Sequence, residues 1–233
     1  RAEAGNEELD PLLRAPELAL RARLLFVQQR TDEAYAQVAA AWPAQQATIS
    51  TVPTLLESRY ALLDTLLSLH EERAACARRE GLALCEQMLD SLATQAKRAV
   101  YFQPRALLCQ ARLLWLQGTM RDVQAAIDAL NQALLLSQRF GMMYDEGLAH
   151  AYLGLIAAHG GAPFSAPIVP PNSAPTPDSP LWRPRLLGGP PLWPSMRYHL
   201  RQAQVLLRTT ASPRELERVN AALRAISAAS KSS

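Results

Sequence analysis

The sequence of 233 residues has few aromatic side chains, few cysteines and almost no lysine. No apolar run approaches the roughly 20 residues that a membrane-spanning helix needs, so we expect no membrane segment. The three cysteines, Cys76, Cys85 and Cys109, are odd in number and scattered, which excludes a disulfide framework. Idle thiols are typical of a reducing compartment, and we therefore expect an intracellular protein, cytoplasmic or nuclear.

The common signatures of catalysis are also missing. The chain has no phosphate-binding glycine loop, no dinucleotide fingerprint, no H-E-x-x-H, no C-x-x-C and no nucleophile elbow. Glu146 and His150 are spaced to touch on one helix, but a solvated surface pair explains that spacing without chemistry. We therefore expect a protein that is not an enzyme, with no cofactor, no metal site and no small-molecule substrate.

Helical signals dominate the rest of the chain, and strand-like alternation is missing. Proline follows a capping residue at Asp10–Pro11 and again at Ser212–Pro213. Two pairs, Thr54 with Glu57 and Ser212 with Glu215, have the spacing of a capping box. The sequence predicts an all-α chain with helices over about 10–29, 31–43, 54–69, 71–98, 103–117, 120–138, 144–159, 195–209 and 212–229.

Residues 160–194 differ from this pattern, because they hold 11 of the 17 prolines and have no helical period. The composition indicates a loop of polyproline character. It carries two Leu-Trp pairs, at Trp182 and Trp193, which are unusual for an inert linker. Either these tryptophans fold back and cover apolar surface, or they anchor a partner.

One segment is repeated later in the chain. Ala22–Gln29 aligns with Ala111–Gly118 at an offset of 89 residues, and five of the eight positions are identical. The offset fits two units of roughly 40 to 45 residues each, the size of helical-pair repeats. A weaker similarity pairs Leu130–Ala133 with Leu200–Ala203. Its offset is 70 residues, whereas Gly118 and Gly160, which follow corresponding helices, are 42 residues apart. The difference of 28 residues is explained if the proline-rich segment is inserted between the two helices of one repeat.

Residues 106–160 also resemble the tetratricopeptide-like (TPR) superfamily. Small residues stand at close-packing positions (Ala111, Ala126 and Ala133), and Gly118 stands at the turn between two helices. The resemblance implies one domain over residues 1–233, a right-handed α-solenoid of about four helical hairpins with a C-terminal capping helix. The hairpins cover about 10–43, 53–98, 103–138 and 143–159 with 195–209, and the cap covers 212–229. A closed bundle is the alternative, and the repeat offset favours the solenoid.

Charge is unevenly distributed along the chain. Residues 181–233 carry nine basic and two acidic residues, whereas residues 1–180 carry 15 basic and 19 acidic ones. Helical geometry places Arg197, Arg201 and Arg208 within about 40° of one another around one helix. Such a stripe suits an acidic peptide or phosphates, although a solvated helix face is the alternative. Because aromatic residues are scarce beside it, we do not expect nucleic acid as the partner.

These features predict a scaffold for protein–protein interaction, which holds a partner peptide or a subunit of a larger complex in the groove of a solenoid. A regulatory segment of a larger signalling NTPase or nucleotide cyclase is the alternative that the resemblance implies. The residues expected to bind the partner are polar groups of the first helices of the hairpins, the two insertion tryptophans and the basic stripe: Arg23, Arg59, Arg105, Arg112, Gln117, Trp182, Trp193, Arg197, Arg201 and Arg208.

Overall fold

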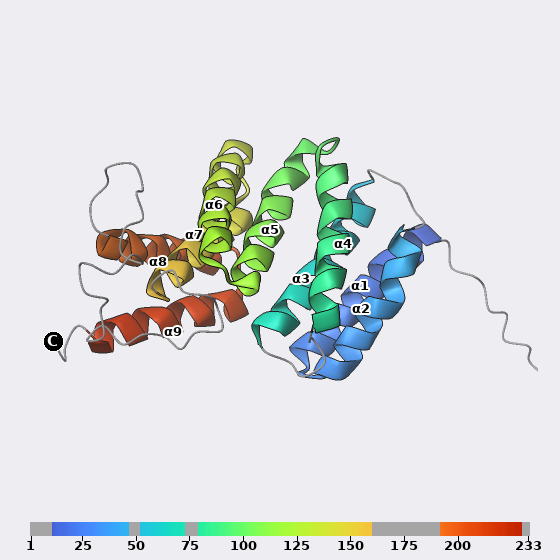
Figure 1. Ribbon diagram of the computed structural model, residues 1–233, viewed down its shortest axis with the longest axis horizontal. Coiled ribbons are helices and arrows are strands. Elements are labelled where there is room, and N and C mark those ends of the chain that lie inside the picture. The colour runs from blue at the N-terminus through green and yellow to red at the C-terminus, as the bar shows by residue number, and fades with distance from the viewer. Residues whose placement is uncertain (1–10, 47–51, 73–78, 160–191, 230–233) are drawn as a thin grey trace, which may run out of the picture. The chain divides into compact units, whose positions relative to one another are not determined.

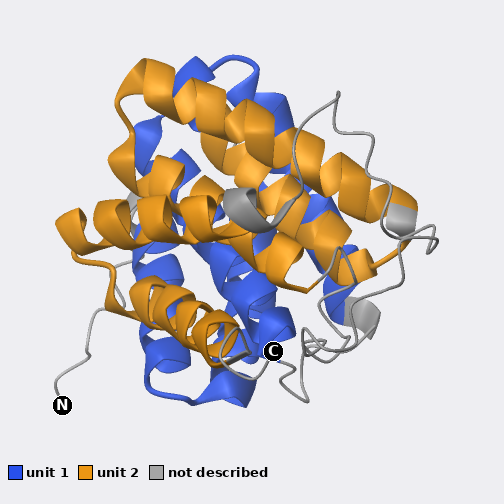
Figure 2. Cartoon of the chain, turned by 90° about the vertical axis from the view of Figure 1, so that its left-hand side faces the viewer, with its two compact units in different colours: residues 1–102 blue, residues 103–233 orange. Residues whose placement is uncertain are grey.

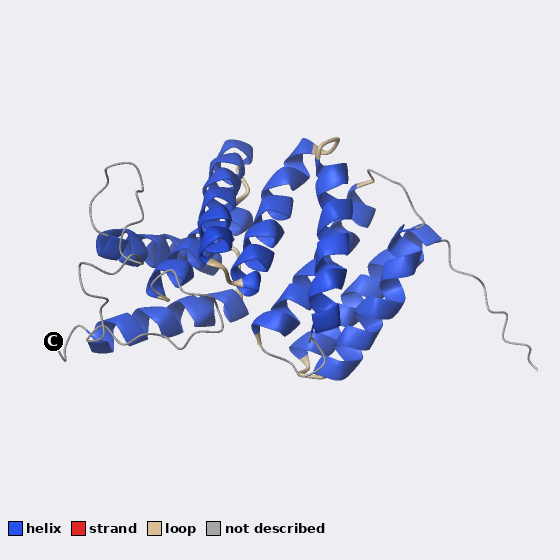
Figure 3. Ribbon diagram, in the orientation of Figure 1, coloured by secondary structure: helices blue, strands red, loops and turns tan. Residues whose placement is uncertain are grey.

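The computed structural model describes residues 11–46, 52–72, 79–159 and 192–229. These residues form nine α-helices and one short 3-10 helix, and they contain no strand (Figures 1 and 3). The prediction of an all-α chain is therefore confirmed for the described residues. The chain divides into two compact units, residues 1–102 and 103–233, each with its own packing (Figure 2).

The first unit contains α1 (Pro11–Val27), α2 (Thr31–Gln46), α3 (Pro53–Glu71), α4 (Arg79–Ala96) and the 3-10 helix Val100–Phe102. Helix α1 contacts α2 and α3, and α3 contacts α4. Helix α1 begins at Pro11, as predicted, because proline needs no hydrogen-bond acceptor at the first helical position. The turn to α2 passes through Gln29 at a φ of 62°, a left-handed conformation that is rare for a residue with a side chain.

One local prediction for the first unit is wrong, and another lies partly outside the described residues. The capping box at Thr54 and Glu57 does not form, because α3 begins one residue earlier, at Pro53, with Val52 as the N-cap and no side-chain cap. The amides of Leu55 and Leu56 bond to the Val52 carbonyl instead. The long helical stretch expected over 71–98 lies partly outside the described residues, within which α3 ends at Glu71 and α4 covers Arg79–Ala96.

The second unit contains α5 (Gln103–Gln117), α6 (Met120–Phe140), α7 (Met143–Ala158), α8 (Leu192–Thr209) and α9 (Pro213–Ala229). Gly118 makes the turn between α5 and α6 at a φ of 78°. Thr119 then caps α6, because its hydroxyl accepts from the Asp122 amide while the Asp122 carboxylate accepts from the Thr119 amide. Helix α9 begins at Pro213 as predicted. The Ser212 amide, which a capping box would join to the Glu215 carboxylate, bonds instead to the Leu207 carbonyl, so the expected box does not form.

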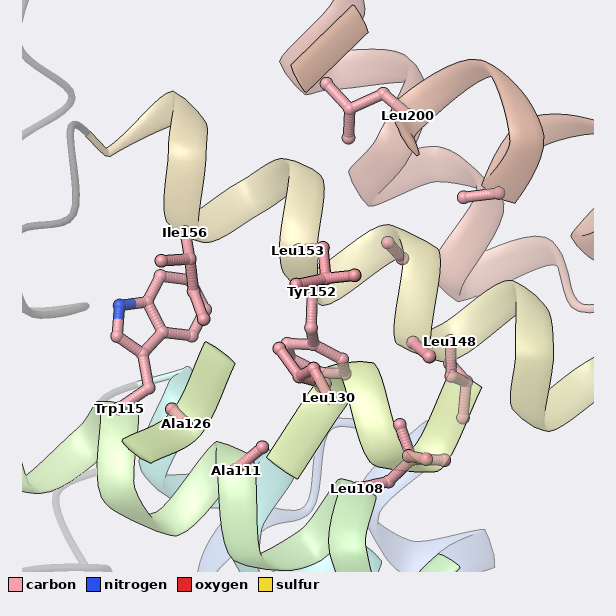
Figure 4. Close-up of a cluster of buried hydrophobic side chains, with 14 of the residues drawn as sticks. Leu108, Ala111, Trp115, Ala126, Leu130, Leu148, Tyr152, Leu153, Ile156 and Leu200 are labelled. Carbon is pink, nitrogen blue, oxygen red and sulfur yellow. The ribbon is translucent and has the colours of Figure 1, made fainter. Parts of the chain in front are cut away.

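The core of the second unit surrounds α7. Figure 4 shows α7 between the α5–α6 pair and α8, with Tyr152 and Ile156 directed toward α5 and α6. The Trp115 ring meets the Tyr152 ring edge to face, with 6.3 Å between centroids. Leu200 of α8 approaches α7 from the other side. Helix α7 is apolar around most of its circumference, which is the pattern of a helix packed on several sides.

Gly154 allows α7 and α8 to approach closely. A β-carbon at this position would lie 2.6 Å from Leu200 Cγ and 3.3 Å from the Leu200 backbone nitrogen. Atoms at such distances overlap, so any side chain here forces the two helices apart. The same face of α7 carries Gly147, where a β-carbon would lie 3.1 Å from Leu206 Cβ. The α7–α8 contact therefore depends on the absence of side chains at these two positions.

Candidate functional site

The outer face of α8 combines positive charge with exposed apolar side chains. Arg197, Arg201 and Arg208 are all exposed, so the basic stripe expected from helical geometry lies on the surface of this helix. The same face carries Tyr198 and Val205, which are 55% and 60% exposed. The order Tyr198, Arg201, Val205, Arg208 follows a spacing of three, four and three residues, which aligns the four side chains along one side of the helix.

A groove of about 610 Å³ lies between α8 and α9, beside this face. The Gln204 amide donates to the Asn220 Oδ1 at 2.6 Å and joins the two helices at the groove. Arginine stands on each helix, at Arg208 and Arg224. The lining residues are Gln204, Arg208, Asn220, Leu223, Arg224, Ser227 and Ala228.

Two of the predicted binding arginines are buried. The Arg59 guanidinium donates to the Gln45 carbonyl in the last turn of α2, where carbonyl groups lack helical partners. Burial lowers the pKa of Arg59. Arg112 lies over the Tyr152 ring, with its guanidinium carbon 5.3 Å from the ring centroid. Because both side chains are buried, neither Arg59 nor Arg112 is placed to contact a partner in an open groove.

The other predicted residues of the first helices have different surroundings. Arg105 bonds through Nε to both carboxylate oxygens of the buried Asp145 at 3.3 Å, and so links α5 to α7. Arg23 and Gln117 are exposed on α1 and α5. Trp182 and the side chain of Trp193 lie outside the described residues, so the two interpretations of the insertion stay predictions.

A pair of histidines, the buried His150 and the partly buried His199, joins α7 to α8. The Nδ1 atoms of His150 and His199 are 2.7 Å apart, and one donates a hydrogen bond to the other. Burial lowers the pKa of His150 and, with the additional effect of the His150 charge, lowers the pKa of His199 to about 4. Both rings are therefore neutral at pH 7, and Tyr198 packs edge-on against each of them.

This pair could not be found by sequence reasoning. His150 was predicted to pair with Glu146 on the surface of α7, but its side chain is buried and meets His199, 49 residues away. Glu146 instead accepts from Gln138. The contacts of Tyr152 with two arginines were missed as well. Arg112 and Arg218 both lie over its ring, and Arg218 of α9 also donates to the Tyr152 hydroxyl at 3.3 Å. No spacing rule connects residues that meet only through helix packing.

The described part of the chain contains no group of three or more side chains placed to hold a metal ion. Within the same residues, no helix is both long enough and apolar enough to cross a membrane.

Comparisons with known proteins add no further assignment. No protein-family model, no curated protein and no solved structure matches this chain.

Proposed function

We propose that this protein is a non-enzymatic interaction module, a right-handed α-solenoid that holds a peptide or a subunit of a larger complex. The observation that carries the proposal is the outer face of α8, where exposed arginines alternate with Tyr198 and Val205 beside the α8–α9 groove. Large apolar side chains exposed next to arginine are typical of protein interfaces. A helix face that contacts only water gains no stability from exposed tyrosine and valine side chains.

The repeated segment supports the solenoid architecture. Gln29 and Gly118, 89 residues apart, both have a positive φ and both occupy the turn between two packed helices. Helices α2 and α6 begin 89 residues apart as well, at Thr31 and Met120. Equal turn geometry at the same offset is expected if the α1–α2 and α5–α6 hairpins are copies of one repeat.

Burial at equivalent positions gives a second line of support. Ala22 and Ala111 are both buried, as are the aromatic residues Phe26 and Trp115 at the matched positions four residues later. A small residue allows the paired helices to approach closely, and the aromatic residue one turn later fills the space below. Two other matched positions differ in burial, because Arg23 and Leu24 are exposed whereas Arg112 and Leu113 are buried.

The proposal is tested by affinity capture with the full chain as bait and quantitative mass spectrometry of the bound proteins. Each enriched protein is then purified, and its binding to the full chain is measured by calorimetry. We expect at least one partner that binds directly at a fixed stoichiometry. If no enriched protein binds directly, while the bait is folded by circular dichroism, the proposal of an interaction module is wrong.

A further inference from the structure

We propose that the surface formed by α8 and α9 binds an acidic amphipathic helix of a partner protein. This inference rests on the proposed interaction function and specifies the chemistry of its ligand. The surface consists of the exposed α8 face (Tyr198, Arg201, Val205 and Arg208) together with the adjoining α8–α9 groove. A ligand of this surface therefore needs an apolar stripe that packs against Tyr198 and Val205, and carboxylates that bond to the arginines.

The spacing of the α8 face matches a helix better than an extended chain. Tyr198 and Val205 are seven residues apart, and so are Arg201 and Arg208, which corresponds to about 10.5 Å along the axis in each case. A partner helix packed along α8 presents its own side chains at the same interval, in rows of i, i+3, i+4 and i+7. Leucines in one row and glutamates in the next therefore meet both kinds of residue on α8.

The electrostatics of the surface favour a negative ligand. The described part of α8 has three exposed arginines and no acidic residue. On α9, Glu215 and Glu217 stand in the first two turns, and neither lines the groove. Within the described residues, Arg208 and Arg224 make no ion pair, so carboxylates of a ligand would not have to displace a partner from either guanidinium. Arginine is also suited to bidentate contact with carboxylates.

The groove adds polar specificity to this charge. The hydrogen bond from Gln204 to Asn220 uses one donor and one acceptor, which leaves the Gln204 Oε1 and the Asn220 Nδ2 able to bond to side chains of the ligand. Leu223 and Ala228 supply apolar lining in the same groove as the two arginines. A ligand helix can therefore bury apolar surface and satisfy its polar groups in the same place.

A protein ligand fits this surface better than a nucleic acid. Binding of single-stranded nucleic acid uses several aromatic platforms along a basic groove. Tyr198 is the one large exposed aromatic side chain on the described part of α8, and the next exposed apolar side chain is the aliphatic Val205. Aliphatic packing beside arginine is typical of amphipathic helix recognition.

The test uses the full chain and two fluorescently labelled peptides of roughly 20 residues, long enough to cover α8. One peptide carries leucine at helical spacing with glutamate beside it, and its twin has lysine in place of glutamate. Fluorescence anisotropy at about 150 mM NaCl is measured for the wild type and for Arg208→Glu/Arg224→Glu. The matched control is Arg14→Glu/Arg121→Glu, which changes the net charge equally at two exposed arginines in the first turns of α1 and α6.

We expect the glutamate peptide to bind the wild type and the control variant equally, and to lose at least about tenfold in affinity for Arg208→Glu/Arg224→Glu. The lysine twin is expected to prefer that variant. Tyr198→Ala/Val205→Ala is expected to weaken the glutamate peptide without changing its salt dependence. Circular dichroism confirms that each variant is folded.

Two results would overturn the inference. One is equal binding of the glutamate peptide to both double arginine variants, and the other is tighter binding of a labelled oligouridine with the same sensitivity at Arg208 and Arg224. Binding of the partner captured in the affinity experiment distinguishes failure of this inference from failure of the proposed function. If that partner still binds Arg208→Glu/Arg224→Glu, the interaction module stands and only the acidic-helix surface is wrong.

Discussion

Helices α7 and α8 lie side by side in the second unit, but they differ in what surrounds them. Helix α7 contacts α5, α6, α8 and α9, and its charged Asp145 is buried against Arg105. Helix α8 buries one face, with Met196, Leu200, Ala203 and Leu207, and leaves its arginines exposed. The two helices pack closely, and their contact includes one polar interaction, between His150 and His199.

This difference indicates a division of roles. Changes on α7 are expected to alter the stability of the unit, because every side of the helix has packing partners. Changes of the exposed arginines on the outer face of α8 are expected to leave stability nearly unchanged and to alter binding. The predictions below test this division, beginning with the largest expected change in stability.

The largest effect is expected at Gly154. Gly154→Val places a branched side chain where a single β-carbon would already lie 2.6 Å from Leu200 Cγ. Forcing α7 and α8 apart is expected to lower the free energy of unfolding by about 3–4 kcal/mol. Urea denaturation followed by circular dichroism measures the loss. Helix propensity alone would raise stability at this position, because valine is a better helix former than glycine. The control is Ala225→Val at an exposed site of α9, and a loss at Gly154 no larger than the loss at Ala225 would contradict the packing explanation.

The next effect compares two arginines. Arg105→Ala removes the ion-pair partner of Asp145, whose side chain is 2% exposed, and is expected to cost about 2–4 kcal/mol. Arg201→Ala removes an exposed arginine from α8 and is expected to change stability by less than about 0.5 kcal/mol. Parallel urea titrations compare the two variants. Equal losses would contradict the division between α7 and α8.

A smaller effect depends on pH. The folded state lowers the pKa of His199 to about 4 and also lowers that of His150, so the unfolded chain binds more protons below its own histidine pKa. Stability is therefore full above about pH 6.5 and falls as the pH decreases toward 4. Because His199 is partly exposed, we expect a loss of about 1–2 kcal/mol between about pH 7 and pH 5.

The control for this pH dependence is His150→Gln/His199→Gln. The double variant lacks both titrating rings at the α7–α8 contact, so its midpoint of thermal unfolding is expected to change less over the same pH range. Burial also lowers the pKa of His70 in the first unit, and this histidine is present in both proteins. If the midpoint of thermal unfolding changes equally with pH in the two proteins, groups other than the histidine pair cause the pH dependence.

The smallest effect concerns the ends of the two helices. Helix α7 ends at Ala158 and is followed by His159 with an ordinary φ of −82°, whereas α8 is followed by Ala211 at a φ of 52°. Ala211→Gly removes the β-carbon that disfavours this conformation and is expected to raise the free energy of unfolding by about 0.5–1 kcal/mol. Denaturant titration against Ala225→Gly, which is expected to lower stability in a helix, shows whether conformation at the turn is the cause.

Much of the helical architecture could be predicted from the sequence because its signals are local. Prolines at Pro11 and Pro213 and the glycine at Gly118 mark helix ends through backbone chemistry alone. The caps were predicted less well. Proline at position 53 starts α3 before Thr54 can cap it, and the true capping box uses Asp122, a residue outside the common Glu or Gln pattern.

The candidate site was only partly predictable, for a physical reason. Helical periodicity identified the exposed stripe of Arg197, Arg201 and Arg208, because residues on one helix keep fixed angles to one another. Burial of Arg59 and Arg112 depends on partners from other helices, namely Gln45 and Tyr152. The groove between α8 and α9 likewise requires the packing of two helices, which no single-helix pattern contains.

The most direct test of the central claim is hydrogen–deuterium exchange of the full chain with and without the glutamate peptide. We predict that binding slows amide exchange in α8 and the second half of α9, while α7 is already slow without the peptide. The exposed apolar residues Leu20, Leu24 and Val27 of α1 provide a competing surface in the same protein. Protection confined to α1, with α8 and α9 unchanged, would contradict the assignment of binding to the α8–α9 surface.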